Sequence, residues 1–209
     1  MKPKQSSVRS KGGFTLIEVL AVIVILGILM TLLVTSLGGN DDAVRAKMTR
    51  VRLAEIGNVC EAYERRFGDF PASSFGADAG QLPNSSNVGG EALVAALWSN
   101  GYEAGGSLKS EDLVNSDEDR TLKSLTDFPG GELLELADGW DQPIAYLRSD
   151  DYGVEHVYLL GPGGADVYES RVRASRDGTA GRYRGHGRFQ IHSAGADGDF
   201  GTEDDLIHP

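Results

Sequence analysis

Residues 14–37 read FTLIEVLAVIVILGILMTLLVTSL, and this stretch decides the fold. Only one of its 24 residues, Glu18, is charged. A helix of that length spans about 36 Å at 1.5 Å per residue, whereas the hydrocarbon core of a bilayer is about 30 Å thick. The stretch therefore predicts a membrane-spanning helix over 14–37.

A buried core helix and a cleaved secretory signal are the alternatives for this stretch. A core helix would carry a polar face, and none is present between Val19 and Met30. A secretory signal has a shorter apolar core, roughly 7–15 residues, followed by a small-residue cleavage site. Residues 35–37 do not provide such a site. The membrane span explains the sequence best.

The charge of Glu18 inside the apolar stretch needs to be compensated. The leader 1–13 is basic and contains no acidic residue. Glu18 lies inside the apolar run, where an ionised side chain near a helix centre costs about 2.5–3.5 kcal/mol. Cleavage after Gly13 would give Phe14 an α-amino group that could pair with Glu18 in the same chain or in a neighbouring copy. Alternatively, Glu18 lies at the membrane interface and reaches water, and the residues alone leave both interpretations open.

Residues 13–20, GFTLIEVL, resemble the type IV prepilin processing site. The resemblance implies cleavage after Gly13 by a prepilin peptidase, N-methylation of Phe14, and a role for Glu18 in assembly through the methylated amine of an adjacent subunit. The positive-inside rule gives a tie, because four Lys or Arg residues precede the apolar run and four follow it closely. The resemblance therefore sets the orientation: a cytoplasmic leader that is removed, a single pass through the bacterial inner membrane, and a head in the periplasm.

Residues 38–209 form the predicted extracytoplasmic head. Gly38-Gly39 predicts a joint, and the next helix runs from Asp41 to about Phe67, where Gly68 fits a C-cap. Its apolar residues recur at steps of three and four and predict one apolar stripe. The stripe comprises Val44, Met48, Val51, Ile56, Val59, Cys60, Tyr63 and Phe67. Cys60, the one cysteine of the chain, is predicted to be a packed residue rather than a nucleophile.

The rest of the head alternates loops with short elements. Residues 71–90 are rich in Ser, Gly, Pro and Asn and predict a loop, 91–99 predict a short helix, and 101–131 predict an irregular excursion. Strand patterns lie at 144–148 and 154–160, joined by a hairpin-like turn, and at 188–192. The sequence thus predicts an α+β fold in which a long N-terminal helix, membrane-spanning and then amphipathic, packs on a small antiparallel sheet.

Further segments resemble, in the right order, the major pseudopilin of type II secretion systems: 63–71, 91–94, 138–147, and 195–198 with 201–206. The resemblance implies a type IV pilin-like fold and a structural, non-enzymatic role. It also implies assembly into a helical homo-oligomeric filament, with other pseudopilins and an inner-membrane assembly platform as partners. Thr35 replaces a proline that this family often carries, and residues 101–131 and 171–188 look like insertions.

The C-terminal loop, residues 193–207, is the predicted metal site. Five carboxylates and no basic residue lie between positions 197 and 205, and such oxygen-rich crowding favours Ca²⁺ over an unfilled loop. Glycines at 195, 198 and 201 let the backbone curl and offer carbonyl ligands. The alternative is a solvated acidic tail. The resemblance implies side-chain ligands from Asp197, Glu203 and Asp205, with Asp199 and Asp204 as substitutes.

Composition and missing motifs exclude other classes of protein. A net charge of −11 argues against nucleic-acid binding. The chain has no P-loop, G-x-S-x-G, H-E-x-x-H or G-x-G-x-x-G motif after a strand, and its four histidines lack metal-ligand spacing. No catalytic residue is predicted. The leading hypothesis is a calcium-stabilised pseudopilus subunit that supports protein export. The alternatives are a type IV pilin or minor pseudopilin of another filament machine, and a membrane-anchored calcium-binding module that does not polymerise.

Overall fold

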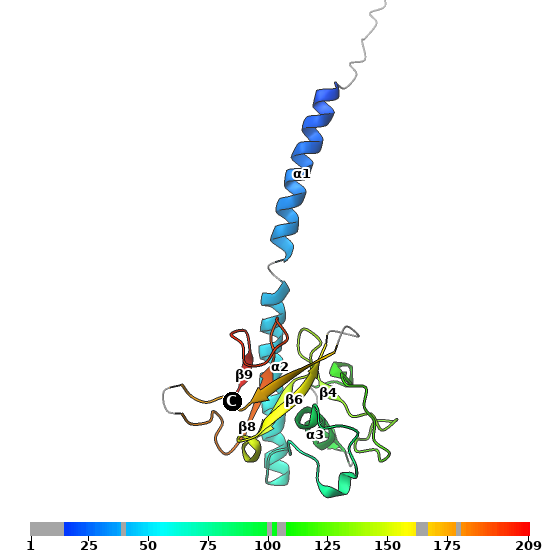
Figure 1. Ribbon diagram of the computed structural model, residues 1–209, viewed down its shortest axis with the longest axis vertical. Coiled ribbons are helices and arrows are strands. Elements are labelled where there is room, and N and C mark those ends of the chain that lie inside the picture. Colours follow the sequence, from blue (N-terminus) through cyan, green and yellow to red (C-terminus); the bar gives the residue numbers. More distant parts are fainter. Residues whose placement is uncertain (1–14, 39–40, 100–101, 104–107, 162–166, 179–180) are drawn as a thin grey trace, which may run out of the picture. The chain divides into compact units, whose positions relative to one another are not determined.

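The computed structural model describes residues 15–38, 41–99, 102–103, 108–161, 167–178 and 181–209. The chain divides into two compact units, Met1–Asp41 and Asp42–Pro209. Helix α1 (Leu16–Gly38) belongs to the first unit, and the second is an α+β head (Figure 1). The head contains α2 (Asp41–Phe67) from its second residue onward, α3 (Val88–Leu97), and strands β1 (Trp98–Ser99), β2 (Tyr102–Glu103), β3 (Leu113–Val114), β4 (Glu135–Leu136), β5 (Ala145–Arg148), β6 (Glu155–Leu160), β7 (Tyr168–Arg173), β8 (Phe189–Ser193) and β9 (Leu206–His208). The predicted α+β class is confirmed.

Helix α1 is an apolar helix whose described side chains are exposed. Leu16 is 85% exposed and Met30 is 68% exposed. The helix ends at Gly38, where the paired glycines predicted an end, and Gly39 lies outside the described residues. Among the described residues, no helix is both long and apolar enough to cross a membrane.

Helix α2 begins and ends where the sequence predicted. Gly68 follows it with φ +86°, and the N–H of Gly68 donates to the carbonyl of Glu64 (2.7 Å), as a glycine C-cap requires. The prediction of one apolar stripe is wrong, however. Leu53, Ile56, Val59 and Cys60 are buried, whereas Val44, Met48, Val51 and Phe67 are more than half exposed.

The two sets of apolar residues lie on different faces of α2. Leu53 comes two positions after Val51, and at 3.6 residues per turn two such positions point to nearly opposite sides. Steps of three and four connect Val44 to Met48 and Val51, but they do not connect these residues to Leu53. The first half of the helix therefore presents a separate apolar face, formed by Val44, Met48 and Val51.

The strands form small antiparallel sheets rather than one. The largest has the order β5-β8-β9, and β6 pairs with β7 in a second sheet. The predicted hairpin between 144–148 and 154–160 is wrong, because β5 pairs with β8, placing Ala145 opposite His192. Strands β7 and β9 were not expected, and β7 extends into the segment that resembled an insertion, 171–188.

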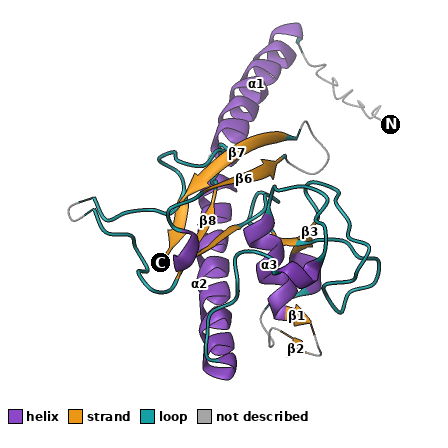
Figure 2. Cartoon of the chain, turned by 60° about the horizontal axis from the view of Figure 1, so that its bottom comes forward, coloured by secondary structure: helices purple, strands orange, loops and turns teal. Residues whose placement is uncertain are grey.

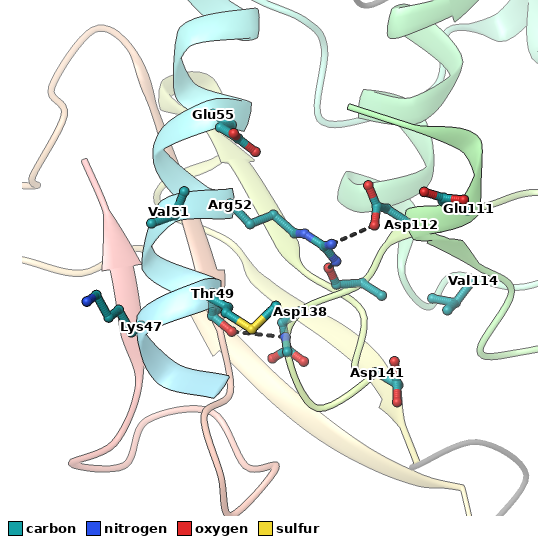
Figure 3. Close-up of a pocket in the computed structure, with 13 residues that line it drawn as sticks. Lys47, Thr49, Val51, Arg52, Glu55, Glu111, Asp112, Val114, Asp138 and Asp141 are labelled. Carbon is teal, nitrogen blue, oxygen red and sulfur yellow. Dashed lines mark hydrogen bonds and ion pairs between the residues drawn. The ribbon is translucent and has the colours of Figure 1, made fainter. Parts of the chain in front are cut away.

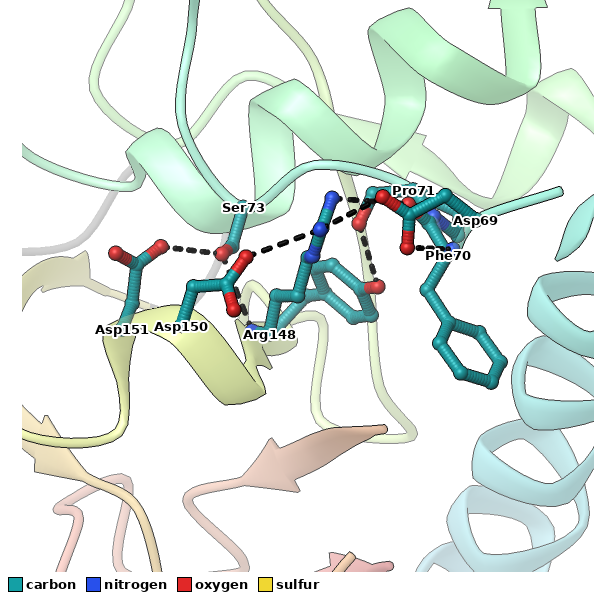
Figure 4. A network of polar contacts seen from close by, with 8 residues as sticks. Asp69, Phe70, Pro71, Ser73, Arg148, Asp150 and Asp151 are labelled. Carbon is teal, nitrogen blue, oxygen red and sulfur yellow. Dashed lines mark hydrogen bonds and ion pairs between the residues drawn. The ribbon is translucent and has the colours of Figure 1, made fainter. Parts of the chain in front are cut away.

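A polar network lies at the end of β5, where the chain leaves the β5-β8-β9 sheet for the sheet of β6 and β7. Arg148 donates to Asp69 (2.7 Å) just beyond α2 and forms an ion pair with Asp150 (3.0 Å) in the turn that follows β5 (Figure 4). Ser73 donates its hydroxyl to Asp151 (2.5 Å) and accepts the N–H of Arg148 (3.1 Å). These contacts hold the turn after β5 against the loop that follows α2. Strand β6 then leaves β5 and pairs with β7.

The core lies where α2, α3 and the three-stranded sheet meet (Figure 2). Ile56, Leu97 and Phe189 are fully buried there. Helix α3 starts three residues before its predicted start, and its first turn lies very close to β5. A Cβ atom on Gly89 would lie 2.2 Å from the carbonyl oxygen of Tyr146, so this contact requires glycine.

Candidate functional site

The first turn of α1 is closed by a capping box. The N–H and hydroxyl of Thr15 donate to Oε2 of Glu18 (2.8 and 2.7 Å), and the N–H of Glu18 lies 3.4 Å from the Thr15 hydroxyl oxygen. This reciprocal arrangement satisfies backbone donors that a helix N-terminus leaves unpaired. In the isolated chain, Glu18 therefore binds its own helix end. The predicted cleavage residues Gly13 and Phe14 lie outside the described residues.

The predicted calcium loop lies between β8 and β9 and is curled by glycines with positive φ at 195, 198 and 201. Asp204 accepts the N–H groups of Ala196 (2.6 Å) and Asp197 (3.0 Å) and the hydroxyl of Thr202 (2.7 Å). Burial acts to raise the pKa of Asp204, but these hydrogen bonds outweigh it and hold the pKa below its usual value. Asp204 thus closes the loop across seven to eight residues.

The other four acidic residues of the loop differ in environment. Asp197 accepts the N–H of Asp199 (2.9 Å), and Asp199 accepts the hydroxyl of Ser170. Asp205 accepts the N–H of Gly201 (2.8 Å) through Oδ2, but its buried Oδ1 has no hydrogen-bond partner, and burial raises the pKa of this carboxyl. Glu203 is exposed. The loop gathers the predicted residues into one turn, and their role as calcium ligands stays a prediction.

A second group of carboxylates in the head was not predicted from the sequence. Oxygens of Glu91, Asp117 and Glu135 all lie within 4.8 Å of one another, and this buried group could hold a metal ion. Asp119 lies next to them. We call these four residues the head acidic cluster. Burial and then the neighbouring carboxylates raise the pKa of Glu91 to about 10. Its members are up to 44 positions apart and follow no local motif, so no signal in the sequence identified them.

A groove of about 560 Å³ lies between the first half of α2 and residues 111–141. Arg52 reaches across from α2 and donates to Asp112 (2.5 Å) and to the carbonyl of Ala137 (2.6 Å), as Figure 3 shows for the ion pair. Met48 and Val51 contribute apolar surface to its wall. The groove lies between an apolar helix face and a wall held by one ion pair. This arrangement suits the binding of a partner rather than catalysis.

Comparison with known proteins connects the N-terminal region to a family. Residues 8–34 match the model of the prokaryotic N-terminal methylation motif, a match that includes Gly13, Phe14 and Glu18. No solved structure gives a significant match to the chain.

Curated relatives extend the similarity into the head. The chain is 33% identical to the type II secretion system core protein G of Aeromonas hydrophila over 46% of this chain and 73% of that protein. It is 30% identical to the protein of the same name from Pseudomonas aeruginosa over 76% of this chain and 88% of that protein. The corresponding Escherichia coli K12 protein is 28% identical over 58% and 83% of the two chains. Because the similarity covers most of these relatives and includes the methylation motif, the chain belongs to the family of type II secretion system core protein G, the pilin-like pseudopilins.

Proposed function

We propose that this pseudopilin is a structural subunit of a type II secretion pseudopilus and supports protein export as part of that filament. Pseudopilins are structural proteins and not enzymes. The observation that carries the proposal is the combination of a basic leader, Gly13-Phe14 and Glu18 at the head of a 24-residue apolar stretch, together with the match of residues 8–34 to the methylation motif. The similarity to core protein G of other bacteria supports the choice of secretion machine.

The first step of the proposed pathway is processing at the membrane. A prepilin peptidase removes residues 1–13 on the cytoplasmic side, and the new amino group of Phe14 is methylated. Residues 14–37 anchor the chain in the inner membrane as a single span, and residues 38–209 lie in the periplasm. The length of the apolar stretch, about 36 Å as a helix, supports the anchor.

Assembly is proposed to change the partner of Glu18. In the isolated chain its carboxylate caps the first turn of α1 through Thr15. In the filament, the methylated amine of Phe14 from an adjacent subunit pairs with this carboxylate, which compensates the cost of placing either charge in an apolar helix bundle. Other pseudopilins and an inner-membrane assembly platform are the further proposed partners.

Calcium binding at the C-terminal loop completes the proposal. The curled backbone, the five carboxylates and the unpartnered Oδ1 of Asp205 support a cation in this loop. A bound Ca²⁺ would fix the loop between β8 and β9 and thereby hold the last strand of the main sheet in place.

Co-expression of the full chain with a prepilin peptidase and a type II assembly platform tests the proposal. We expect the mature chain to begin at methylated Phe14 by mass spectrometry, and filaments to be visible by electron microscopy. Glu18→Ala is expected to be processed but not assembled. Thr15→Ala, which removes only the hydroxyl that contacts Glu18, is the matched control and is expected to be processed and to assemble.

Two results would contradict the proposal. A mature N-terminus other than Phe14 would remove its foundation. Processed wild-type chains that form no filament would instead support a membrane-anchored module that does not polymerise.

A further inference from the structure

The head acidic cluster joins three parts of the chain that are far apart in sequence. Glu91 lies in the first turn of α3, Glu135 lies in β4, which packs against α3, and Asp117 and Asp119 follow β3. Glu91 is 2% exposed, Glu135 is fully buried and Asp119 is 7% exposed. Glu91, half-buried Asp117 and Glu135 thus come within 4.8 Å of one another, with Asp119 beside them, on different elements from those that form the C-terminal loop.

The hydrogen bonds around the cluster leave three of its oxygens without a partner. Asn84 donates to Oδ2 of Asp117 (2.9 Å) and of Asp119 (3.2 Å), so these two oxygens are satisfied. The buried oxygens Oδ1 of Asp117, Oδ1 of Asp119 and Oε1 of Glu91 have no hydrogen-bond partner. Glu135 is held by Asn87 (2.9 Å) and by the N–H of Ser116 (3.2 Å).

The backbone between the two aspartates has an unusual conformation. Glu118 has φ +57°, a left-handed conformation that non-glycine residues adopt rarely. Asp117 and Asp119 both reach the same donor, Asn84, across this residue.

A cation would balance the negative charge of the head acidic cluster. The ion pairs among the described residues engage other carboxylates, among them Asp112 and Glu132. Burying an unpaired carboxylate is costly, and several at one place repel one another. A cation among the free oxygens would remove both costs at once.

The donor set selects the kind of cation. All side-chain ligands offered are oxygens, which favours a hard ion over zinc or copper, whose sites use His and Cys. Ca²⁺ accepts six to eight oxygens in flexible geometry, whereas Mg²⁺ demands a regular octahedron and keeps several waters. Four carboxylates from three separate elements fit the flexible ion better.

We propose that the head acidic cluster is a second calcium site, which clamps the loop after β3 onto the start of α3. This loop belongs to the 101–131 segment that looked like an insertion, so the ion would fix an added part of the head. The proposal does not depend on processing, on filament assembly or on calcium at the C-terminal loop.

The test uses the full chain in detergent, stripped with a chelator, and CaCl₂ alone as the probe. The background is Asp204→Asn with Asp205→Asn, which weakens the C-terminal loop. In this background we expect one bound Ca²⁺ by equilibrium dialysis, a rise in melting temperature on adding calcium, and slower proteolysis within residues 113–120. Adding Glu91→Gln and Glu135→Gln should abolish the stoichiometric calcium and the rise, while MgCl₂ should bind at least about tenfold more weakly than CaCl₂.

Matched variants keep the test decisive. Glu132→Gln, which removes a nearby carboxylate outside the cluster, should leave calcium binding unchanged. If the Glu91→Gln, Glu135→Gln chain does not fold, Asp117→Asn alone should still weaken binding about tenfold or more. Equal calcium binding with and without the cluster substitutions would overturn the proposal. The proposal would also be overturned if the chain bound no calcium and Glu91→Gln raised its melting temperature. The cluster would then be a set of protonated carboxyl groups.

Discussion

His192 is a neutral histidine in the interior of the head. It is 1% exposed, and its Nε2 lies 2.8 Å from Oε1 of Gln190. The amide of Gln190 is oriented by its donation to the carbonyls of Ser175 (2.9 Å) and Arg184 (2.7 Å), so Oε1 is an acceptor and Nε2 of His192 carries the proton. Burial, and then the charge of Arg184, lowers the pKa of His192 to about 4.

The contribution of His192 to the stability of the head should therefore be lost in acid. The pKa of His192 is near 6.5 in the unfolded chain and about 4 in the folded one, so the unfolded state binds the proton first as pH falls. Between pH 7 and pH 5 this linkage should lower the free energy of unfolding by about 2 kcal/mol. Urea denaturation of wild type and His192→Gln in chelator measures the difference.

The control for this prediction is His186→Gln, which changes an exposed histidine. It is expected to keep the wild-type dependence on pH, whereas His192→Gln should lose the 2 kcal/mol component. An unchanged pH dependence in His192→Gln would show that His192 does not determine the loss in acid.

The prediction that Cys60 is a packed residue is confirmed. Cys60 is fully buried in the core, and burial raises the pKa of its thiol, which suits a packed residue and not a nucleophile. The sequence supported this outcome, because Cys60 recurs with Ile56, Val59 and Tyr63 at helical spacing.

At the scale of elements, the first half of α2 presents its separate apolar face to solvent. Val44 and Val51 are each 55% exposed and Met48 is 61% exposed. A contiguous apolar face of this kind on a helix is typical of a contact with another protein. In a pseudopilin the expected partner is a neighbouring subunit of the filament.

Met48→Lys with Val51→Lys should block filament assembly and leave the head folded. The charges would be buried without partners in a subunit contact, but they remain solvated in the monomer. Electron microscopy and sedimentation of co-expressed chains measure assembly, and circular dichroism melting measures folding. Val154→Lys, at a 53% exposed valine outside α2, is the matched control and should assemble. Normal filaments from the double variant would exclude this face from the interface.

At the scale of the whole molecule, the proposed calcium sites coincide with concentrations of acidic residues. Removing the four leader cations takes the net charge from −11 to −15, and much of this charge is concentrated in the C-terminal loop and the head acidic cluster. Two bound calcium ions would offset four of these charges. The two proposed sites lie on different elements, so each should protect its own part of the head.

Asp204→Asn tests the C-terminal site separately. The asparagine keeps an oxygen for the N–H groups of Ala196 and Asp197 but removes the charge. In millimolar calcium, where extracytoplasmic sites with Kd of about 10⁻⁴–10⁻³ M are occupied, this variant should lose the protection of its last residues against carboxypeptidase. Asp150→Asn, an exposed acid elsewhere, should behave as wild type. A wild-type C-terminus that calcium does not protect would contradict calcium binding by this loop.

The sequence by itself determined the elements whose signal is local. The apolar stretch, the basic leader, Glu18 and the C-cap of α2 are each encoded by residues that are contiguous in the chain, and the α+β class follows from the helix and strand periodicities. Tertiary structure alone decided which face of α2 is buried, that β5 pairs with β8, and that Glu91, Asp117, Asp119 and Glu135 meet. Periodicity fixes how side chains alternate along an element, but the partner of a strand or of a carboxylate 44 residues away depends on how all the elements pack together.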